Sequence, residues 1–192
     1  MRISSVVLSG GKSSRMGTNK SLLKLDEKPV ISHIIEEMQT LTDDVFIITN
    51  DPQIYTFTGL SMFSDRYKGK GPLAGLESAF YHIPSDVFLI AACDMPFIHH
   101  RVYTYLLKYL DDYDAVIPIY DTQTHPLVGI YRRSVHSHIQ EQLVKNELRV
   151  KSFFNNINIK YIDDFGSISE ETLKRHFFNM NNPDEYERAK SL

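Results

Sequence analysis

Cysteine and long apolar runs are both scarce in this chain of 192 residues. With Cys93 as its one cysteine, the chain cannot form an internal disulfide. No apolar run approaches the roughly 20 residues that a membrane-spanning helix needs. The N-terminus also lacks the charged and then apolar start of a signal peptide. These absences predict a protein of the reducing cytoplasm with no membrane partner.

An excess of positive charge is also absent. The formal net charge is -3, so the chain has no general affinity for nucleic acid or for an anionic membrane. The cations near the N-terminus are therefore expected to act locally. A hydrophobic share of 42% over this length suits a continuous core, so residues 1–192 are predicted to form a single α/β domain.

The most informative segment spans residues 8–20 and reads LSGGKSSRMGTNK. It directly follows an apolar run and contains no acidic residue. Gly10 and Gly11 lack Cβ atoms, so the backbone can bend sharply and bring its N–H groups against an anion. The segment therefore predicts a phosphate-binding loop for a nucleotide. Its positive charges are Lys12, Arg15 and Lys20.

Two better-known phosphate motifs do not fit this segment. Residues 11–13, Gly-Lys-Ser, look like the end of a Walker A loop, but the glycine required five positions before Gly11 is Val6. The dinucleotide fingerprint needs G-x-G-x-x-G, whereas Gly10 and Gly11 are adjacent and Gly17 comes next. An NTPase P-loop and a hydride-transfer enzyme are both disfavoured.

Apolar runs along the chain predict a buried, largely parallel sheet, because most of them are too apolar for strands with one wet face. The runs are Val6 to Leu8, Val45 to Thr49, Leu60 to Phe63, Val87 to Ala92, Ala115 to Ile119 and Leu127 to Tyr131. The helical patterns between them are Pro29 to Leu41, Pro72 to His82, His100 to Leu110 and Ser134 to Lys145. This alternation predicts a three-layer, doubly wound, Rossmann-like α/β fold with a mostly parallel sheet.

In such a sheet the ligand lies outside the carboxyl ends of the strands. The glycine-rich segment follows the first strand, and Asn50, Asp65 and Asp94 follow three later runs. All four segments are therefore predicted to meet at one crevice. Mg²⁺ prefers one or two protein carboxylates and leaves its other positions to water and phosphate oxygens. Asp94 is the candidate ligand, although it could instead end a strand and begin a turn with Pro96.

The pattern L-x-G-G-x-x-x-R-M-G-x-x-K over residues 8–20 resembles the nucleotidyltransferases of the molybdenum cofactor guanylyltransferase family. The loop alone is shared with cytidylyl- and sugar nucleotidyltransferases, but further elements in the family's order extend the resemblance over essentially the whole chain. Asn19 departs from it, since many relatives carry Asp before the lysine. The further elements are Asp65, Gly71-Pro72-Leu73-Ala74-Gly75-Leu76, Ala92-Cys93-Asp94-Met95-Pro96, His125-Pro126 and Asn179-Met180-Asn181-Asn182-Pro183.

The resemblance implies a nucleotidyltransferase fold and a Mg²⁺-dependent reaction of GTP with molybdenum-molybdopterin, giving the guanine dinucleotide form and pyrophosphate. Arg15 and Lys20 would neutralise the triphosphate and the leaving pyrophosphate, and Asp94 would hold the metal. Other molybdenum cofactor biosynthesis proteins and acceptor molybdoenzymes are the implied partners. The implied nucleotide-binding residues are Leu8, Ser9, Gly10, Gly11, Lys20, Asn50, Asp65 and Asp94.

Several of these roles have a plainer alternative. Asp65 could accept two hydrogens from guanine N1 and N2, or it could cap the glycine-rich loop that follows. Asn50 could serve the site or stabilise the next turn. His125 could contact the second substrate or simply occupy a polar turn. Asn179 and Asn181 share one side of an extended segment, so both could face the crevice and bind the pterin or metal-bound water.

Two features outside the crevice have structural accounts. The pair His99-His100 is predicted to be a solvated helix start, because no nearby Cys or carboxylate set completes a zinc site. Asn182 followed by Pro183 and two acids predicts a capped helix, with Asn182 as the cap.

Two other functions remain open on the sequence. A cytidylyl- or uridylyltransferase acting on another phosphorylated small molecule would share the N-terminal loop, which does not name the base. A nucleotide-sensing adaptor would bind GTP without turnover, although Arg15, Lys20 and Asp94 argue against it.

Overall fold

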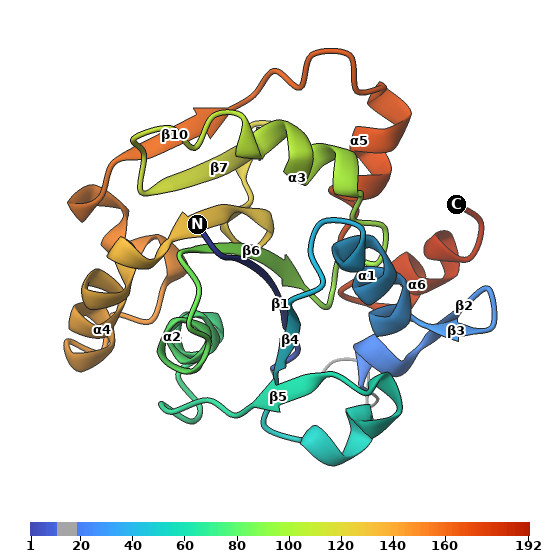
Figure 1. The fold of residues 1–192 in the computed structure, drawn as a ribbon. Helices are drawn as coiled ribbons and strands as arrows, with labels where there is room; N and C mark the ends of the chain where they lie inside the picture. The colour runs from blue at the N-terminus through green and yellow to red at the C-terminus, as the bar shows by residue number, and fades with distance from the viewer. Residues whose placement is uncertain (11–18) are drawn as a thin grey trace.

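A computed structural model describes residues 1–10 and 19–192 of the chain (Figure 1). The strands of its main sheet are β1 (Ile3–Leu8), β4 (Val45–Ile48), β5 (Ser61–Phe63), β6 (Val87–Ala92), β7 (Ala115–Tyr120), β8 (Gln123–Thr124), β9 (Ile130–Arg132) and β10 (Ile159–Ile162). They are ordered β10-β7-β9-β6-β1-β4-β5, and β8 pairs with β7. Two short strands, β2 (Lys24–Leu25) and β3 (Lys28–Pro29), form a separate antiparallel hairpin.

The sheet is mostly parallel, as predicted. β1 runs parallel to β4 and β6, β4 to β5, and β7 to β10. The strand predicted over residues 127–131 is present but starts later, because Pro126–Val128 form a 3₁₀ turn; β9 begins at Ile130 and runs antiparallel to β6 and β7. Gly129 lies so close to β7 that a Cβ there would be 2.8 Å from Ile117 Cδ1.

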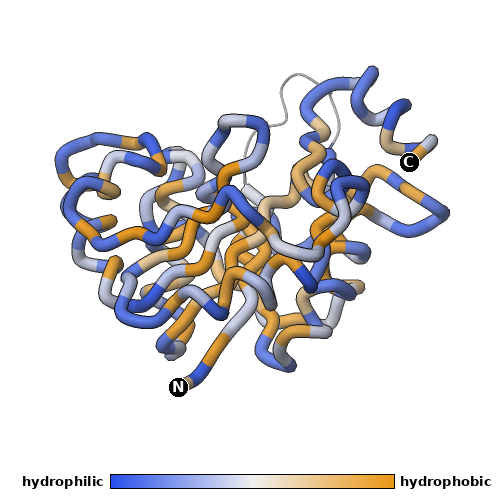
Figure 2. Tube along the Cα trace, turned by 90° about the horizontal axis from the view of Figure 1, so that it is seen from above, coloured by the Kyte–Doolittle hydropathy of each residue, from blue (hydrophilic) through white to orange (hydrophobic). Residues whose placement is uncertain are grey.

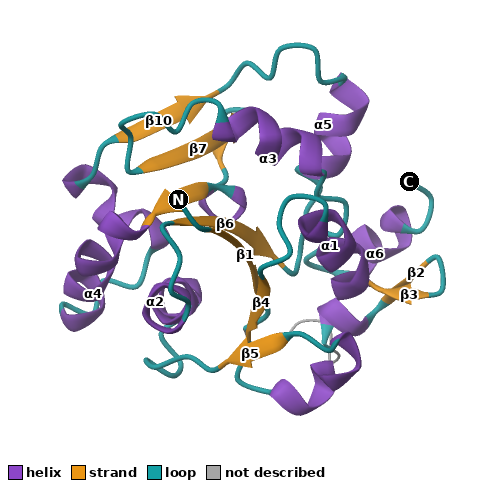
Figure 3. Ribbon diagram, in the orientation of Figure 1, coloured by secondary structure: helices purple, strands orange, loops and turns teal. Residues whose placement is uncertain are grey.

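Helices cover both faces of the sheet and complete the three layers (Figures 1 and 3). On one face lie α1 (Val30–Gln39), α3 (His100–Leu107) and α5 (Glu170–His176), followed by α6 (Pro183–Ala189) near the C-terminus. On the other face lie α2 (Pro72–His82) and α4 (His136–Val144). The strand β6 and the helix α2 have the bounds predicted for them, whereas β10 and α5 were not predicted.

Strand side chains alternate between two buried clusters, one on each face of the sheet. Val7 belongs to the cluster under α1 and α3, while its neighbours Val6 and Leu8 belong to the cluster under α2 and α4. This period of two, with both faces buried, explains why the strands are almost continuously apolar in sequence. Figure 2 shows the same distribution, with hydrophobic segments inside and hydrophilic loops outside.

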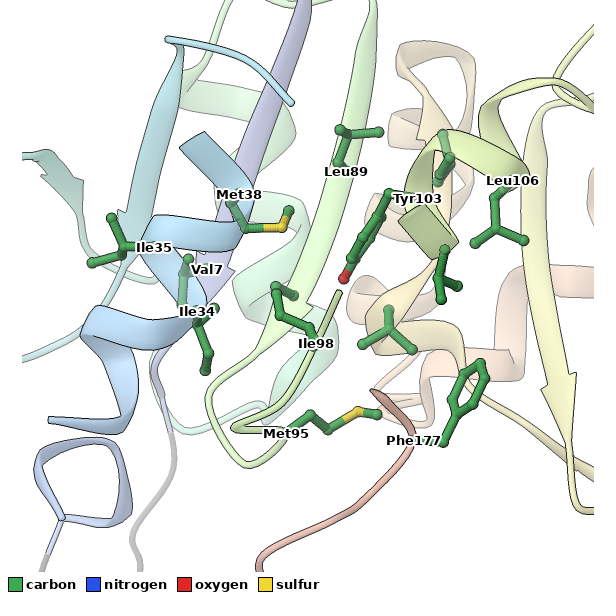
Figure 4. Close-up of a cluster of buried hydrophobic side chains, with 14 of the residues drawn as sticks. Val7, Ile34, Ile35, Met38, Leu89, Met95, Ile98, Tyr103, Leu106 and Phe177 are labelled. Carbon is green, nitrogen blue, oxygen red and sulfur yellow. The ribbon is translucent and has the colours of Figure 1, made fainter. Parts of the chain in front are cut away.

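The cluster under α1 and α3 joins helices to the sheet. Ile34 and Met38 of α1, Leu89 of β6 and Tyr103 of α3 converge there (Figure 4). The buried Tyr103 hydroxyl donates a hydrogen bond to Ile90 O at 2.7 Å, and burial raises the pKa of this phenol. Within the described ranges, no helix combines the length and apolar character needed to cross a membrane.

The connections of β1 and β6 create a topological switch point. From β1 the chain passes through α1 to β4, and it later returns through α2, on the opposite face, to β6 on the other side of β1. Leu8 pairs with Ala92, and the main-chain N of Cys93 donates to Leu8 O at 3.2 Å. The residues that follow the two strands therefore leave the sheet side by side, where ligands bind in open α/β sheets.

Candidate active site

A cleft opens at these strand ends and brings together segments from remote parts of the chain. It is lined by Leu8, Ser9, Gly10, Asn19, Lys20, Ile48, Asp65, Gly71, Pro72, Gly75, Ala92, Cys93, Asp94 and Leu127. An adjoining hollow shares Ser9, Gly10 and Asp65 and is also lined by Asn50. The predictions for Gly11 and Arg15 lie outside the described residues.

A buried tyrosine organises the approach to Lys20. The hydroxyl of Tyr55, which is fully buried, lies 2.6 Å from Ser9 Oγ and 2.6 Å from Ser21 Oγ. Asn19 Nδ2 donates to the same hydroxyl at 2.9 Å, and Asn19 Oδ1 accepts from the main-chain N of Ser21 at 3.1 Å. The amide therefore both donates and accepts, which an ionised Asp could not do. This pairing gives Asn19 a local role that an aspartate would not fill.

Lys20 begins the 3₁₀ helix η1 (Lys20–Leu22) and points its amine across the cleft to the C-terminal part of the chain. Lys20 Nζ donates to Asn181 Oδ1 at 3.2 Å, and the two residues are 161 positions apart. The partner is a neutral amide, and among the described residues no carboxylate forms an ion pair with this ammonium.

Asp94 follows β6 and is held by the segment that contains Asn179 and Asn181. Its main-chain O accepts from Met180 N at 2.8 Å. With the amide nitrogen turned toward Asp94, Asn179 donates to Asp94 O at 3.3 Å and to Asp94 Oδ2 at 3.2 Å. Asn179 and Asn181 therefore point the same way from their segment: Asn179 contacts Asp94, and Asn181 contacts Lys20.

Electrostatics at Asp94 reflect its partly enclosed position. Burial raises the pKa of the Asp94 carboxyl, Glu185 adds to the rise, and Lys20 opposes it. The adjacent Cys93 thiol has its pKa raised to about 11 by burial and by the Asp94 charge. Because the thiolate is the nucleophilic form of cysteine, this thiol is unsuited to attack a substrate.

On the opposite side of the cleft, Asn50 and Asp65 bind each other reciprocally. Asn50 Nδ2 donates to Asp65 Oδ2 at 2.8 Å, and Asp65 N donates to Asn50 Oδ1 at 3.1 Å. Asn50 therefore orients the carboxylate. Burial raises the pKa of Asp65, and the hydrogen bond from Asn50 opposes that rise.

Glycines keep the space beside Asp65 open. A Cβ at Gly75 would lie 3.7 Å from Asp65 Oδ1, and one at Gly10 would lie 3.9 Å from Asp65 Oδ2. Larger side chains at these two positions would cover both carboxylate oxygens. Gly71, at the start of α2, has a φ of 70°, a left-handed conformation that favours glycine.

A buried ionic network behind Asp65 was not predicted from the sequence. Glu77 on α2 is fully buried, and its Oε1 accepts from Arg66 Nη1 at 2.7 Å, His136 Nε2 at 3.2 Å and Gln140 Nε2 at 3.1 Å. The Glu77 Oε2 atom has no partner among the described residues. A charged residue inside the apolar stripe of α2 was the one sequence signal for this network.

Arg66 connects this network to Asp65, its neighbour in the chain. The main-chain N of Arg66 donates to Ser78 Oγ at 2.8 Å, and its guanidinium lies 3.5 Å from the ring centroid of Tyr81. Helix α2 thus holds Arg66 by both its main chain and its side chain. We infer that the same contacts restrict where Asp65 can lie.

His125 lies apart from the residues that line the cleft. Its ring packs against Phe177 with centroids 4.6 Å apart, and its Nε2 lies 3.4 Å from Tyr120 O. Burial lowers the pKa of this imidazole. The interpretation of His125 as a turn residue accounts for these contacts, whereas Leu127 is the nearby residue that reaches the cleft.

Comparison with known proteins gives consistent matches over nearly the whole chain. A family model for the MobA-like NTP transferase domain matches residues 5–159. A probable molybdenum cofactor guanylyltransferase from Clostridium perfringens is 37% identical over 187 residues, spanning 96% of this chain and 94% of that protein. One from Carboxydothermus hydrogenoformans is 32% identical over 183 residues, spanning 95% and 92%.

A solved structure is similar over the same extent. The crystal structure of molybdopterin-guanine dinucleotide biosynthesis protein A from Archaeoglobus fulgidus matches with a TM-score of 0.81 at 25% identity, covering 98% of this chain and 97% of that one. These findings confirm the predicted fold and the predicted resemblance. The family model ends at residue 159 and therefore does not cover Asn179 and Asn181. Their contacts with Asp94 and Lys20 are seen in the structure.

Proposed function

This chain belongs to the MobA-like NTP transferase family, and on that premise we propose that it transfers GMP from GTP to molybdenum-molybdopterin, with release of pyrophosphate. The observation that carries the proposal is that Lys20, Asp65 and Asp94 line one cleft at the switch point. They offer a cation for phosphate, an acceptor for the base and a carboxylate for a metal. We further propose a cytoplasmic location and acceptor molybdoenzymes as downstream partners.

The cleft residues suit a magnesium ion. Asp94 supplies a hard oxygen ligand in a half-buried position, and the Asn179 amide would orient that carboxylate. Mg²⁺ takes few protein ligands and completes its shell with water and phosphate oxygens, so one carboxylate is sufficient. When bound, the ion would neutralise charge on the triphosphate.

Lys20 acts on the phosphates through its unneutralised ammonium. Fixed positive charge stabilises the negative charge that develops on leaving pyrophosphate, and Arg15 is proposed to share this role from its motif position. The attacking group is the phosphate of the pterin. It is ionised near neutral pH, so alignment with the α-phosphorus matters more than a general base.

Asp65 is proposed to select guanine. An ionised carboxylate can accept hydrogen bonds from N1–H and N2–H of guanine together. Asn50 orients this carboxylate, and the space left by Gly10 and Gly75 admits a flat base beside it.

The test is an assay of the full chain with Mg²⁺, molybdenum-molybdopterin and each of GTP, CTP, UTP and ATP in turn. We expect pyrophosphate and the dinucleotide product from GTP alone. Product from CTP or UTP would assign a different transferase. Binding of GTP without pyrophosphate formation would assign an adaptor.

Two lysine variants, one in the cleft and one outside it, test whether Lys20 takes part in the reaction. Lys20→Ala should abolish transfer while the fold is retained, as judged by circular dichroism. Lys24→Ala, which removes an exposed lysine of the β2–β3 hairpin, should leave the rate unchanged. Equal rates in the two variants would remove Lys20 from the mechanism.

A further inference from the structure

Three side chains of types that can bind metals meet outside the cleft, where α1 lies against the start of α3. They are Glu37, His99 and His100, and their ligand atoms all lie within 4.8 Å of one another. The prediction of a helix start at His99-His100 is confirmed, with His99 as the cap of α3. Its accompanying premise, that no carboxylate joins these histidines, is wrong, because Glu37 arrives from 63 residues earlier in the chain.

Glu37 orients His100 through two contacts. Glu37 Oε2 accepts from the main-chain N of His100 at 2.8 Å and lies 2.9 Å from His100 Nδ1. The Glu37 Oε2 atom and His100 Nδ1 therefore face the same point. A metal ion at that point would take the place of the proton between them, with His100 as a neutral imidazole protonated on Nε2 and both Nδ1 and the Glu37 carboxylate as ligands. Glu37 Oε1 accepts no hydrogen bond from the described residues.

His99 lies beside this pair, and its ring accepts one weak hydrogen bond from the protein, which a bound metal ion would replace. The rings of His99 and His100 have centroids 4.6 Å apart. His99 Nδ1 accepts from the main-chain N of Arg101 at 3.2 Å, at the long end of the hydrogen-bond range. Because a neutral imidazole has one lone pair, metal binding through either nitrogen of His99 would replace this one bond.

We propose that Glu37, His99 and His100 bind a divalent transition-metal ion of the zinc type. Two imidazoles and one carboxylate form a three-ligand zinc set that leaves a fourth position for water. Nitrogen donors favour zinc-type ions, whereas the carboxylate of Asp94 suits Mg²⁺. The two sites therefore differ in the ions that they select.

The surroundings of the cluster set a moderate affinity. Glu37 and His99 line a surface hollow together with Glu36 and Glu171, which add negative charge, and with Arg175, which opposes a cation. The Arg101 charge also acts on His99. Because these charges oppose one another, we expect reversible binding. A bound ion would link α1 to the start of α3 at His99, which lies five residues after Asp94 in the chain.

Isothermal titration of Zn²⁺ into the full chain, in buffer that contains excess Mg²⁺, tests the site. We expect one saturable equivalent in the wild type and at least a tenfold weaker affinity in both His99→Ala and His100→Ala. His138→Ala removes a histidine on α4 and is the matched control, with unchanged binding. Asp94→Asn should also retain the full equivalent, because it alters the cleft and leaves the cluster intact.

A measurement on the wild type keeps the test independent of variant folding. Added Zn²⁺ should shift the ring resonances of His99 and His100 in NMR spectra, and it should raise the melting temperature by stabilising the folded state. The proposal is overturned if the wild type shows no saturable binding, if both histidine variants bind as the wild type does, or if Asp94→Asn abolishes the equivalent.

Discussion

On one side of the cleft, Asn50 and Asp65 bind each other through two hydrogen bonds of 2.8 and 3.1 Å, whereas on the other side Lys20 meets Asn181 at 3.2 Å. We call the first the base side, made of Asn50, Asp65, Arg66 and Glu77. We call the second the phosphate side, made of Lys20, Asp94, Asn179 and Asn181.

The two sides differ in the charges that lie behind the cleft, although Asp65, Lys20 and Asp94 are each hydrogen-bonded to a neutral asparagine. On the base side, the Arg66 guanidinium is paired with the buried Glu77 carboxylate at 2.7 Å. On the phosphate side, Lys20 and Asp94 are each hydrogen-bonded to a neutral asparagine, and no ion pair joins them in the part of the chain that is described. In the proposed site, the Arg66–Glu77 pair would preserve the shape of the base side, while Asp65, Lys20 and Asp94 would remain available to the nucleotide and a metal ion.

Replacing the charge of Asp94 should have the largest effect. Asp94→Asn keeps the size of the side chain and removes the metal-binding carboxylate, so kcat should fall by on the order of 10³-fold. Thermal stability should be retained, because burial disfavours the ionised form of Asp94. Initial rates of pyrophosphate release and a melting curve measure the two effects. Turnover near the wild-type rate would exclude Asp94 as the metal ligand.

Breaking the network on the base side should instead cost stability. Glu77→Ala leaves Arg66 and His136 without their shared acceptor, and removal of one partner of a buried pair costs about 3 kcal/mol. Urea denaturation measures this loss. Glu36→Gln is the matched control, because it breaks a surface pair with Lys28 in which both side chains are 54% exposed. If the two variants were equally stable, Glu77 would not support the base side.

Asp65→Asn should separate binding from chemistry. The variant loses a charged acceptor, so the KM for GTP should rise by about 10- to 100-fold. The kcat should change little, in contrast to Asp94→Asn. Steady-state rates with GTP and with CTP measure the split and the loss of base selectivity. A fall in kcat with unchanged KM would place Asp65 on the phosphate side.

Asn181→Ala tests the neutral partner of Lys20. Loss of one hydrogen bond to a charged group should lower kcat/KM by about 5- to 10-fold. Asn182→Asp keeps a helix-capping side chain next to it and should retain the wild-type rate. If both variants were fully active, the 3.2 Å contact of Lys20 would have no catalytic consequence.

The smallest effect should be a shift of a pH profile. Burial raises the pKa of Asp65 and the Asn50 hydrogen bond lowers it, so GTP affinity should decline as pH falls through this raised value. Asn50→Ala removes the contact that stabilises the ionised carboxylate, and the acid limb should move to higher pH. Measurement of KM for GTP against pH tests the direction. An unmoved limb would show that Asn50 does not tune Asp65.

Much of the fold was predictable because its signals are local. β6 ends at Ala92 and α2 starts at Pro72, as their apolar patterns indicate. The strand predicted at residues 127–131 begins only at Ile130, because its apolar pattern does not reveal that Pro126 starts a 3₁₀ turn or that Gly129 passes close to β7. The placement of Asp94 beside the first strand was predictable from the rule for carboxyl ends of parallel strands.

The partners of the charged residues were decided by the tertiary structure. Asn181 lies 161 positions from Lys20, and Glu37 lies 63 positions from His100, so no local spacing relates them. The sequence by itself determined the layered fold and the acid that follows β6, because backbone preference and apolar period act over a few residues. The packing of helices across the sheet decides which charged side chains form ion pairs and which remain unpaired. That packing is a property of the folded chain.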